Sequence, residues 1–398
     1  MGLLAACSRP VPPTETFTLA SATEPRVPSP TVQPTGTPLP SPVTGLTELH
    51  MQDALTGWAW ASKPDNSFSL LHTLDGGATW SDVTPQNLPI VSFGSFFLDS
   101  KTAWVQLFDS TTNTNGLARS TDGGKTWSIL NSSLAFANAG LTFTSQSNGW
   151  AETADVGAGN AYVQLYQTSD GGTTWNQVQI VAPAPEPSLQ PGTIHLCNIC
   201  GDTLYYDPQR LVLTSGDLAT SPGGAVRLSI SKNLGKTWTA LKLPLPSHQY
   251  AQDLIAPHSP TFFGPNDGVL PVQIASPDFS TNTLAVYFTH DGGATWTPGA
   301  AVLEGVSAYS LVDFLSLQDA YARCGSSLCA THDASQTWQK LPGNLDFDTS
   351  GTGTYVFHFD FADAMTGWAI TTDGTSSTLW KTMDGGMTWT KLSPRFAP

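Results

Sequence analysis

Six aspartates in predicted loops are the residues whose type and spacing best suit chemistry on a ligand. One occurs in each of six repeating segments, in stretches rich in Ser, Thr, Asn and Gly: Asp65, Asp109, Asp155, Asp217, Asp278 and Asp373. Two carboxylates about 5 to 10 Å apart would suit glycoside hydrolysis. A ring of single carboxylates would suit a cationic peptide, a metal ion or sugar hydroxyls. Aspartates in such loops also accept hydrogen bonds from their own turns, so the sequence leaves all three interpretations open.

A further set of acidic residues lies in an octapeptide that occurs seven times. The copies read TLDGGATW from residue 73, STDGGKTW from 120, TSDGGTTW from 168, SKNLGKTW from 231, THDGGATW from 289, THDASQTW from 331 and TMDGGMTW from 382. The acid, or Asn in one copy, precedes the Trp by the same spacing throughout. The pairs are Asp75 and Trp80, Asp122 and Trp127, Asp170 and Trp175, Asn233 and Trp238, Asp291 and Trp296, Asp333 and Trp338, and Asp384 and Trp389.

The composition of this octapeptide predicts a structural turn. Its carboxylate can accept hydrogen bonds from the backbone N–H groups of the turn, and its glycines allow a positive φ without steric cost. The Trp ring can cover the base of the hairpin, and its N–H needs an acceptor. Because every group can be satisfied locally, we expect the seven copies to build the fold and to bind no ligand. The variant copies with Asn233 or Ala334-Ser335 fit such a role.

An apolar motif alternates with the octapeptide and predicts the elements that position it. It reads LHMQDALTGWAW from 49, FFLDSKTAWVQL from 96, LTFTSQSNGWAE from 141, LYYDPQRLVLTS from 204, FFGPNDGVLPVQ from 262, FLSLQDAYARC from 314 and FDFADAMTGWAI from 359. Each copy predicts a strand, a polar turn and a second strand. A period of about 40 to 60 residues suits one four-stranded propeller blade. We therefore predict an all-β, seven-bladed propeller over residues 44–398, with the octapeptides on one face and the six loop aspartates on the other.

Both motifs resemble those of known families. The octapeptide resembles the Asp-box, or BNR repeat, of sialidases and sortilin-type receptors. Its combination with the apolar motif is most similar to the photosystem II assembly and stability factor family. The resemblance implies a propeller and is shared by enzymes and binding proteins. In that family it implies docking to membrane proteins through basic patches, whereas this chain has a formal net charge of -15.

Catalysis of the sialidase type would require three converging arginines, a Tyr–Glu pair and an early Arg-Ile-Pro strand. No Arg-Ile-Pro occurs, and the predicted propeller contains only Arg119, Arg210, Arg227, Arg323 and Arg395. The G-x-S-x-G nucleophile motif is also missing from the sequence. These observations favour a binding protein over an enzyme, and no cofactor is expected.

The cysteines and histidines predict disulfides and no metal site. Once Cys7 is assigned to a lipid, four cysteines remain. In an exported protein they are expected to pair locally as Cys197–Cys200 and Cys324–Cys329, with a four-thiolate zinc site as the alternative. The eight histidines show neither H-E-x-x-H nor paired ligand spacing. His290 and His332 each precede an octapeptide Asp and are expected to be turn or surface residues.

The N-terminal region predicts a lipid anchor and a tether. Leu4-Ala5-Ala6-Cys7 resembles a bacterial lipobox, which implies that residues 1–7 end a truncated lipoprotein signal and that Cys7 is lipidated. Residues 8–43 are rich in Pro, Ser and Thr, a composition that cannot bury a core and suits a linker. We expect an extracytoplasmic lipoprotein held on the bacterial cell membrane by the N-terminal lipid only.

Charge and composition limit the classes of partner that we expect. Lys and Arg number 16 against 31 acidic residues, too few and too scattered to follow a phosphate backbone, so no nucleic-acid partner is expected. The first hypothesis is a monomeric, non-catalytic binding or assembly scaffold. Its protein or glycan ligand would lie on the face opposite the octapeptides. A glycoside hydrolase using paired loop aspartates is the second hypothesis, and a photosystem or other membrane-complex assembly factor is the third.

Overall fold

The computed structural model describes residues 45–65, 67–85, 90–109, 114–130, 132, 134, 139–183, 190–216, 225–306, 312–348 and 353–397. The chain divides into two units, Met1–Thr37 and Pro38–Pro398, and every described residue belongs to the second. The predicted signal segment 1–7, with Cys7, and the linker 8–43 lie outside the described residues.

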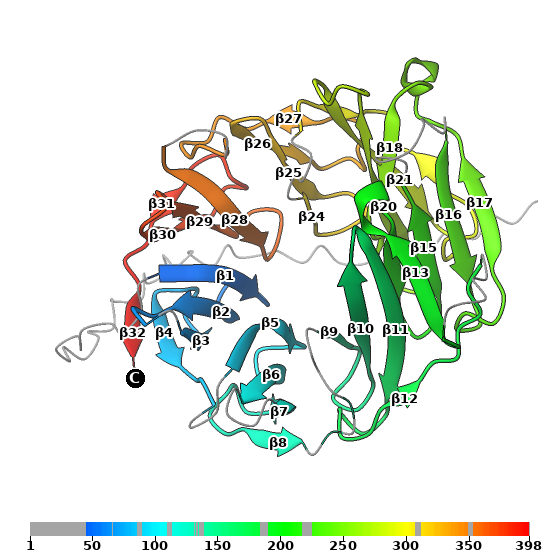
Figure 1. Ribbon diagram of the computed structural model, residues 1–398. Coiled ribbons are helices and arrows are strands. Elements are labelled where there is room, and N and C mark those ends of the chain that lie inside the picture. Colours follow the sequence, from blue (N-terminus) through cyan, green and yellow to red (C-terminus); the bar gives the residue numbers. More distant parts are fainter. Residues whose placement is uncertain are drawn as a thin grey trace, which may run out of the picture. The chain divides into compact units, whose positions relative to one another are not determined.

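Seven antiparallel sheets follow one another around a ring in chain order (Figure 1), which confirms the predicted seven-bladed propeller. Blade 1 contains β1 (Gly45–Met51), β2 (Gly57–Ser62), β3 (Phe68–Thr73) and β4 (Thr79–Asp82). Blade 2 contains β5 (Ile90–Phe97), β6 (Ala103–Asp109), β7 (Thr114–Ser120) and β8 (Ser128–Leu130). Blade 3 contains β9 (Gly140–Phe143), β10 (Gly149–Gly157), β11 (Asn160–Thr168), β12 (Asn176–Gln177) and the added β13 (Thr193–Cys197).

The remaining blades repeat this plan. Blade 4 contains β14 (Thr203–Tyr206), β15 (Leu211–Ser215), β16 (Val226–Ser231) and β17 (Thr239–Leu243). Blade 5 contains β18 (Leu254–Pro257), β19 (Thr261–Phe262), β20 (Gly268–Ala275), β21 (Asn282–Thr289), β22 (Thr297–Pro298) and β23 (Leu303–Glu304). Blade 6 contains β24 (Val312–Phe314), β25 (Ala320–Cys324), β26 (Ser327–Thr331) and β27 (Gln339–Lys340). Blade 7 contains β28 (Tyr355–Phe361), β29 (Gly367–Thr372), β30 (Ser377–Thr382) and β31 (Thr390–Lys391).

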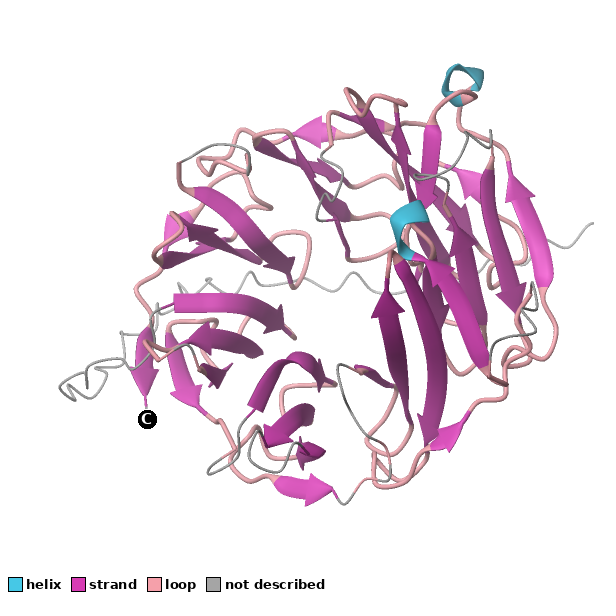
Figure 2. Ribbon diagram, in the orientation of Figure 1, coloured by secondary structure: helices cyan, strands magenta, loops and turns pink. Residues whose placement is uncertain are grey.

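Helical structure in the described part of the chain is limited to two single turns. These are the 3₁₀ helices η1 (Asn198–Cys200) and η2 (His248–Tyr250), which stand out among the strands in Figure 2. Neither has the length or the apolar character needed to cross a membrane. The structure therefore depends on packing between sheets.

Adjacent blades pack through apolar clusters, one for each of the seven contacts around the ring. At three of these contacts an aromatic residue of the second strand stacks on an aromatic residue of the next blade's first strand. Trp104 and Phe143 stack with ring centroids 3.6 Å apart, and Tyr321 and Phe361 with centroids 3.7 Å apart. The recurrent apolar motif thus supplies the contacts between blades, and such aromatic pairs add to the free energy of area burial.

The ring is closed by the C-terminal strand β32 (Arg395–Ala397), whose role the sequence left open. It pairs in parallel with β4, the outermost strand of the first blade. Phe396 packs against the apolar cluster that joins blades 7 and 1 and includes Trp80. Backbone pairing and apolar packing together hold the last segment of the chain on the first blade.

Candidate functional site

The octapeptide turns use their carboxylates within the turn itself. In blade 1, the Thr79 N–H donates to Asp75 Oδ1 at 2.7 Å, and the Gly77 N–H donates to Thr73 Oγ1 at 3.0 Å. Equivalent bonds occur in the other six copies. Leu234 in blade 4 and Ala334 and Ser335 in blade 6 adopt φ values of 56°, 57° and 56° where the remaining copies have glycine. The turn geometry is therefore kept even where the residue type makes it unfavourable.

The octapeptide tryptophans reach different acceptors. The indole N–H groups of Trp127 and Trp238 donate to the carbonyls of Val83 and Val181 in the preceding blades. Those of Trp175 and Trp296 donate to glycine carbonyls of their own turns, and that of Trp338 donates to the hydroxyl of Ser335. The buried indole nitrogens of Trp80 and Trp389 have no acceptor among the described residues. These contacts connect the turns to the blades.

The described loop aspartates also bind within their own loops. Asp278 Oδ1 accepts from the Ser276 and Ser280 hydroxyls at 2.7 and 2.8 Å, and these bonds hold the pKa of Asp278 down at about 2. Asp65 and Asp373 accept hydrogen bonds from the side chains and backbone N–H groups of the residues that follow them. The bonds from the hydroxyls of Ser67 and Thr375 are the largest cause of the lowered pKa values of these two aspartates. Each of these carboxylates stabilises its own turn.

Of the other three predicted loop aspartates, only Asp155 has a side chain in the described structure. Asp155 lies on β10, paired with Tyr162, because this hairpin continues further than the sequence indicated. Asp109 ends β6, but its side chain is outside the described part. Asp217 lies wholly outside it.

The structure joins Cys197 to Cys200 and Cys324 to Cys329 by disulfide bonds. The arginines serve separate contacts: the guanidinium of Arg119 lies over Trp104, and that of Arg210 lies over Phe262 and beside Asp207. His290 and His332 each contact an aspartate of the neighbouring turn, at 2.7 and 2.9 Å. Among the residues that the structure describes, no group of three His, Cys, Asp or Glu side chains could hold a metal ion.

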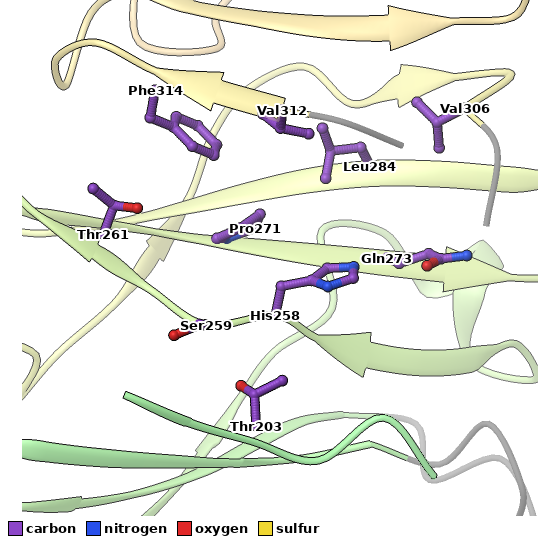
Figure 3. Close-up of a pocket in the computed structure, with 10 residues that line it drawn as sticks. All are labelled: Thr203, His258, Ser259, Thr261, Pro271, Gln273, Leu284, Val306, Val312 and Phe314. Carbon is purple, nitrogen blue, oxygen red and sulfur yellow. The ribbon is translucent and has the colours of Figure 1, made fainter. Parts of the chain in front are cut away.

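A cavity of about 380 Å³ lies among the strands of blades 4, 5 and 6 and was not predicted from the sequence. In Figure 3, Thr203 of blade 4 lies on one side and Val312 and Phe314 of blade 6 on the other, with the strands of blade 5 between them. The lining residues are Thr203, His258, Ser259, Thr261, Pro271, Gln273, Leu284, Val306, Val312 and Phe314. Its volume is in the range of small-ligand sites.

The cavity combines an apolar wall with a few fixed polar groups. Gln273 is buried, and its side-chain amide donates to Asn282 Oδ1 at 2.9 Å. His258 hydrogen bonds to Gln273, but burial lowers the pKa of His258 below its usual 6.5. The imidazole is therefore neutral near pH 7, so that one ring nitrogen donates a hydrogen bond and the other accepts one. This arrangement suits an uncharged group with apolar surface.

Two aspartates on the innermost strands of blades 6 and 7 link blades 6, 7 and 1. Asp313 Oδ2 accepts from the Phe361 N–H at 2.9 Å, and Asp360 Oδ2 accepts from the Met51 N–H at 2.6 Å. Burial raises the pKa of Asp313 to about 7 and also raises that of Asp360. Because edge N–H groups need partners, both carboxyls act as links between blades. Neither link was predicted from the sequence, although an acid between apolar residues in VDF and FDF is a signal.

Glu152 on β10 is a half-buried carboxyl that was not predicted from the sequence. Burial raises its pKa from 4.5 to about 7. Tyr206 on β14 of the next blade lies near enough to feel its charge, and burial raises the pKa of that phenol as well. A carboxyl with such a pKa can donate or accept a proton near neutral pH.

Comparisons with known proteins agree with the repeat and the fold. A family model described as BNR/Asp-box repeat matches residues 118–128. The comparison with curated proteins found no match.

Among solved structures, a PL25 ulvan lyase is similar with a TM-score of 0.51 and 10% identity, over 90% of this chain and 95% of that one. YCF48 bound to a D1 peptide has a TM-score of 0.49 and 16% identity, over 87% and 93%. An α-L-arabinofuranosidase of Fusarium graminearum has a TM-score of 0.37 and 16% identity, over 74% and 93%. At these identities the lyase supports the propeller fold alone. The chain thus carries the Asp-box repeat within a seven-bladed propeller.

Proposed function

We propose that the protein is a non-catalytic binding protein or assembly scaffold, and that a protein partner inserts an uncharged apolar group into the cavity between blades 4, 5 and 6. The composition of the cavity carries this proposal. Pro271, Leu284 and Phe314 offer apolar contact, while Gln273 and His258 offer hydrogen bonds. With His258 neutral, all the lining side chains are uncharged, which suits binding and orientation of such a group.

The proposal is tested by closing the cavity. Ser259 lines it and is exposed, so Ser259→Trp places a large ring there without disturbing the core. Gln179→Trp, at an exposed position of blade 3, is the matched control. Wild-type protein and Q179W, used as baits on membrane extract, should retain the same partner. The partner is then purified and titrated against the wild type, Q179W and S259W. S259W should bind it at least tenfold more weakly. Equal affinity of S259W and Q179W would contradict the proposal.

Polysaccharide cleavage is the second candidate, and Glu152 is the observation that favours it. Asp65, Asp278 and Asp373 stabilise their own turns, whereas Glu152 has a pKa of about 7 beside Tyr206. A single group of this kind can act as a general acid or base. The test is a panel of polysaccharides assayed for new reducing ends and for unsaturated products. Cleavage by the wild type that is lost in Glu152→Gln would establish an enzyme. If neither protein cleaves any polysaccharide of the panel, the result supports the binding function instead.

A further inference from the structure

Five exposed apolar side chains gather on the turns of blades 7 and 1. They are Leu55 at 58% exposure, Leu74 at 66%, Met365 at 55%, Met383 at 74% and Met387 at 52%. Leu55 and Met365 lie in turns between first and second strands, and the others lie in octapeptide turns. Together these residues form what we call the apolar turn patch.

Hydrogen bonds hold these turns next to one another on one face of the ring. The Gly76 N–H donates to the Leu55 carbonyl at 2.7 Å, and the Gly385 N–H donates to the Met365 carbonyl at 2.9 Å. Between the blades, Lys381 Nζ donates to the Ala54 carbonyl at 3.3 Å, and the Trp368 indole donates to the Gly76 carbonyl at 2.9 Å. The apolar turn patch is therefore carried by two blades that are fixed to each other.

The other blades show that the turns do not need apolar residues at these positions. The residue whose carbonyl accepts the same turn hydrogen bond is Lys101, Ser147, Asn266 or Gln318 in blades 2, 3, 5 and 6. The octapeptide position of Leu74 and Met383 is occupied in the other copies by Thr121, Ser169, Lys232, His290 and His332. Apolar residues at both positions occur together in blades 7 and 1, which are neighbours. Clustered exposed apolar residues mark interaction surfaces, and methionine adapts to varied partners.

The charges around the apolar turn patch indicate what covers it. Asp53, Asp75, Asp363 and Asp384 lie in the same turns, exposed or half-buried, and their oxygens accept hydrogen bonds from backbone N–H groups of those turns. Lys381 is a basic residue beside them. We propose that the apolar turn patch docks an amphipathic segment of a partner protein, with Lys or Arg flanking its apolar side. Complementary charge would fix the segment's position. The surface is independent of the cavity between blades 4, 5 and 6.

A defined probe tests this surface in the full-length protein. The probe is a fluorescein-labelled 15-residue peptide of Leu and Lys ordered as an amphipathic helix, and its comparison is a scrambled peptide of the same composition. Wild-type protein should bind the ordered peptide at least tenfold more tightly than the scrambled one, as measured by fluorescence anisotropy. The variant L74S/M383S/M387S should lose that difference. The variant I129S/V156S/V181S should keep it, because it removes three similarly exposed apolar side chains elsewhere (56%, 66% and 57%).

Several results would overturn the proposal. One is equal binding of the two peptides to the wild type. Another is an equal loss of the preference for the ordered peptide in both variants, when both variants melt at the same temperature as the wild type. Doubling of the wild-type mass in light scattering, lost in L74S/M383S/M387S, would assign the patch to a second copy of the chain. Binding of the ordered peptide only after removal of residues 1–44 would assign it to that segment. Retention on phosphatidylglycerol vesicles that requires Leu74, Met383 and Met387 would assign it to a lipid surface.

Discussion

At the scale of single residues, acidic side chains accept hydrogen bonds from backbone N–H groups either within their own turn or in the next blade. The octapeptide carboxylates bond within their own turns, so their spacing alone indicated a structural role. Asp313 and Asp360 bond to N–H groups of the following blade. The local sequence does not indicate which strand edge an acidic side chain will contact. These hydrogen bonds between blades could therefore be found only from the structure.

Glu152 gives a pH prediction at this scale. Because burial raises its pKa from 4.5 to about 7, the folded protein holds this proton more tightly than the unfolded chain. The contribution to stability is therefore present below about pH 4.5 and is lost as the pH rises through 7. From pH 4 to pH 8, the wild type should lose on the order of 3 kcal/mol relative to Glu152→Gln. Denaturant unfolding measures this difference, and parallel pH profiles for the two proteins would contradict it.

Among the elements, the four strands of each blade were predictable because the two motifs alternate along the chain. The closing strand β32 was not, because Arg-Phe-Ala carries no motif and its pairing with β4 joins opposite ends of the described chain. The strands predicted for the hairpin of β10 and β11 ended too early. Asp155 was therefore assigned to the loop, although it lies on β10. Register depends on cross-strand contacts that the sequence does not display.

Removal of β32 tests its role in closing the ring. A chain that ends at Ser393 loses the pairing with β4 and the packing of Phe396. It should be less stable by about 2 kcal/mol or more, from lost apolar burial and backbone bonds. A chain that ends at Ala397 is the control and should melt with the wild type. Calorimetry that finds the same melting temperature for all three chains would show that the ring closes without this strand.

At the scale of the whole molecule, the propeller was predictable and the cavity was not. Seven repeats of four strands allow few arrangements, whereas the cavity depends on side chains from three blades that meet only after the ring forms.

The proposed lipid anchor is a second feature of the whole molecule. Expressed in a bacterial host behind a complete lipoprotein signal, the protein should incorporate labelled palmitate and sediment with membranes, while its Cys7→Ser variant should do neither. Equal labelling and sedimentation of both proteins would refute the anchor.

Hydrogen exchange of the full-length protein, with and without the partner recovered by the wild-type bait, tests the central claim most directly. If the partner enters the cavity, exchange should slow in β24 and in the segment from β18 to β20, where the β18–β19 connection, β19 and β20 contribute lining residues. The Asp-box turns of blades 2 to 6 should exchange as before, because their carboxylates serve the turns alone. Unchanged exchange in β18 to β20 and in β24, with slowing centred on those Asp-box turns, would contradict the account.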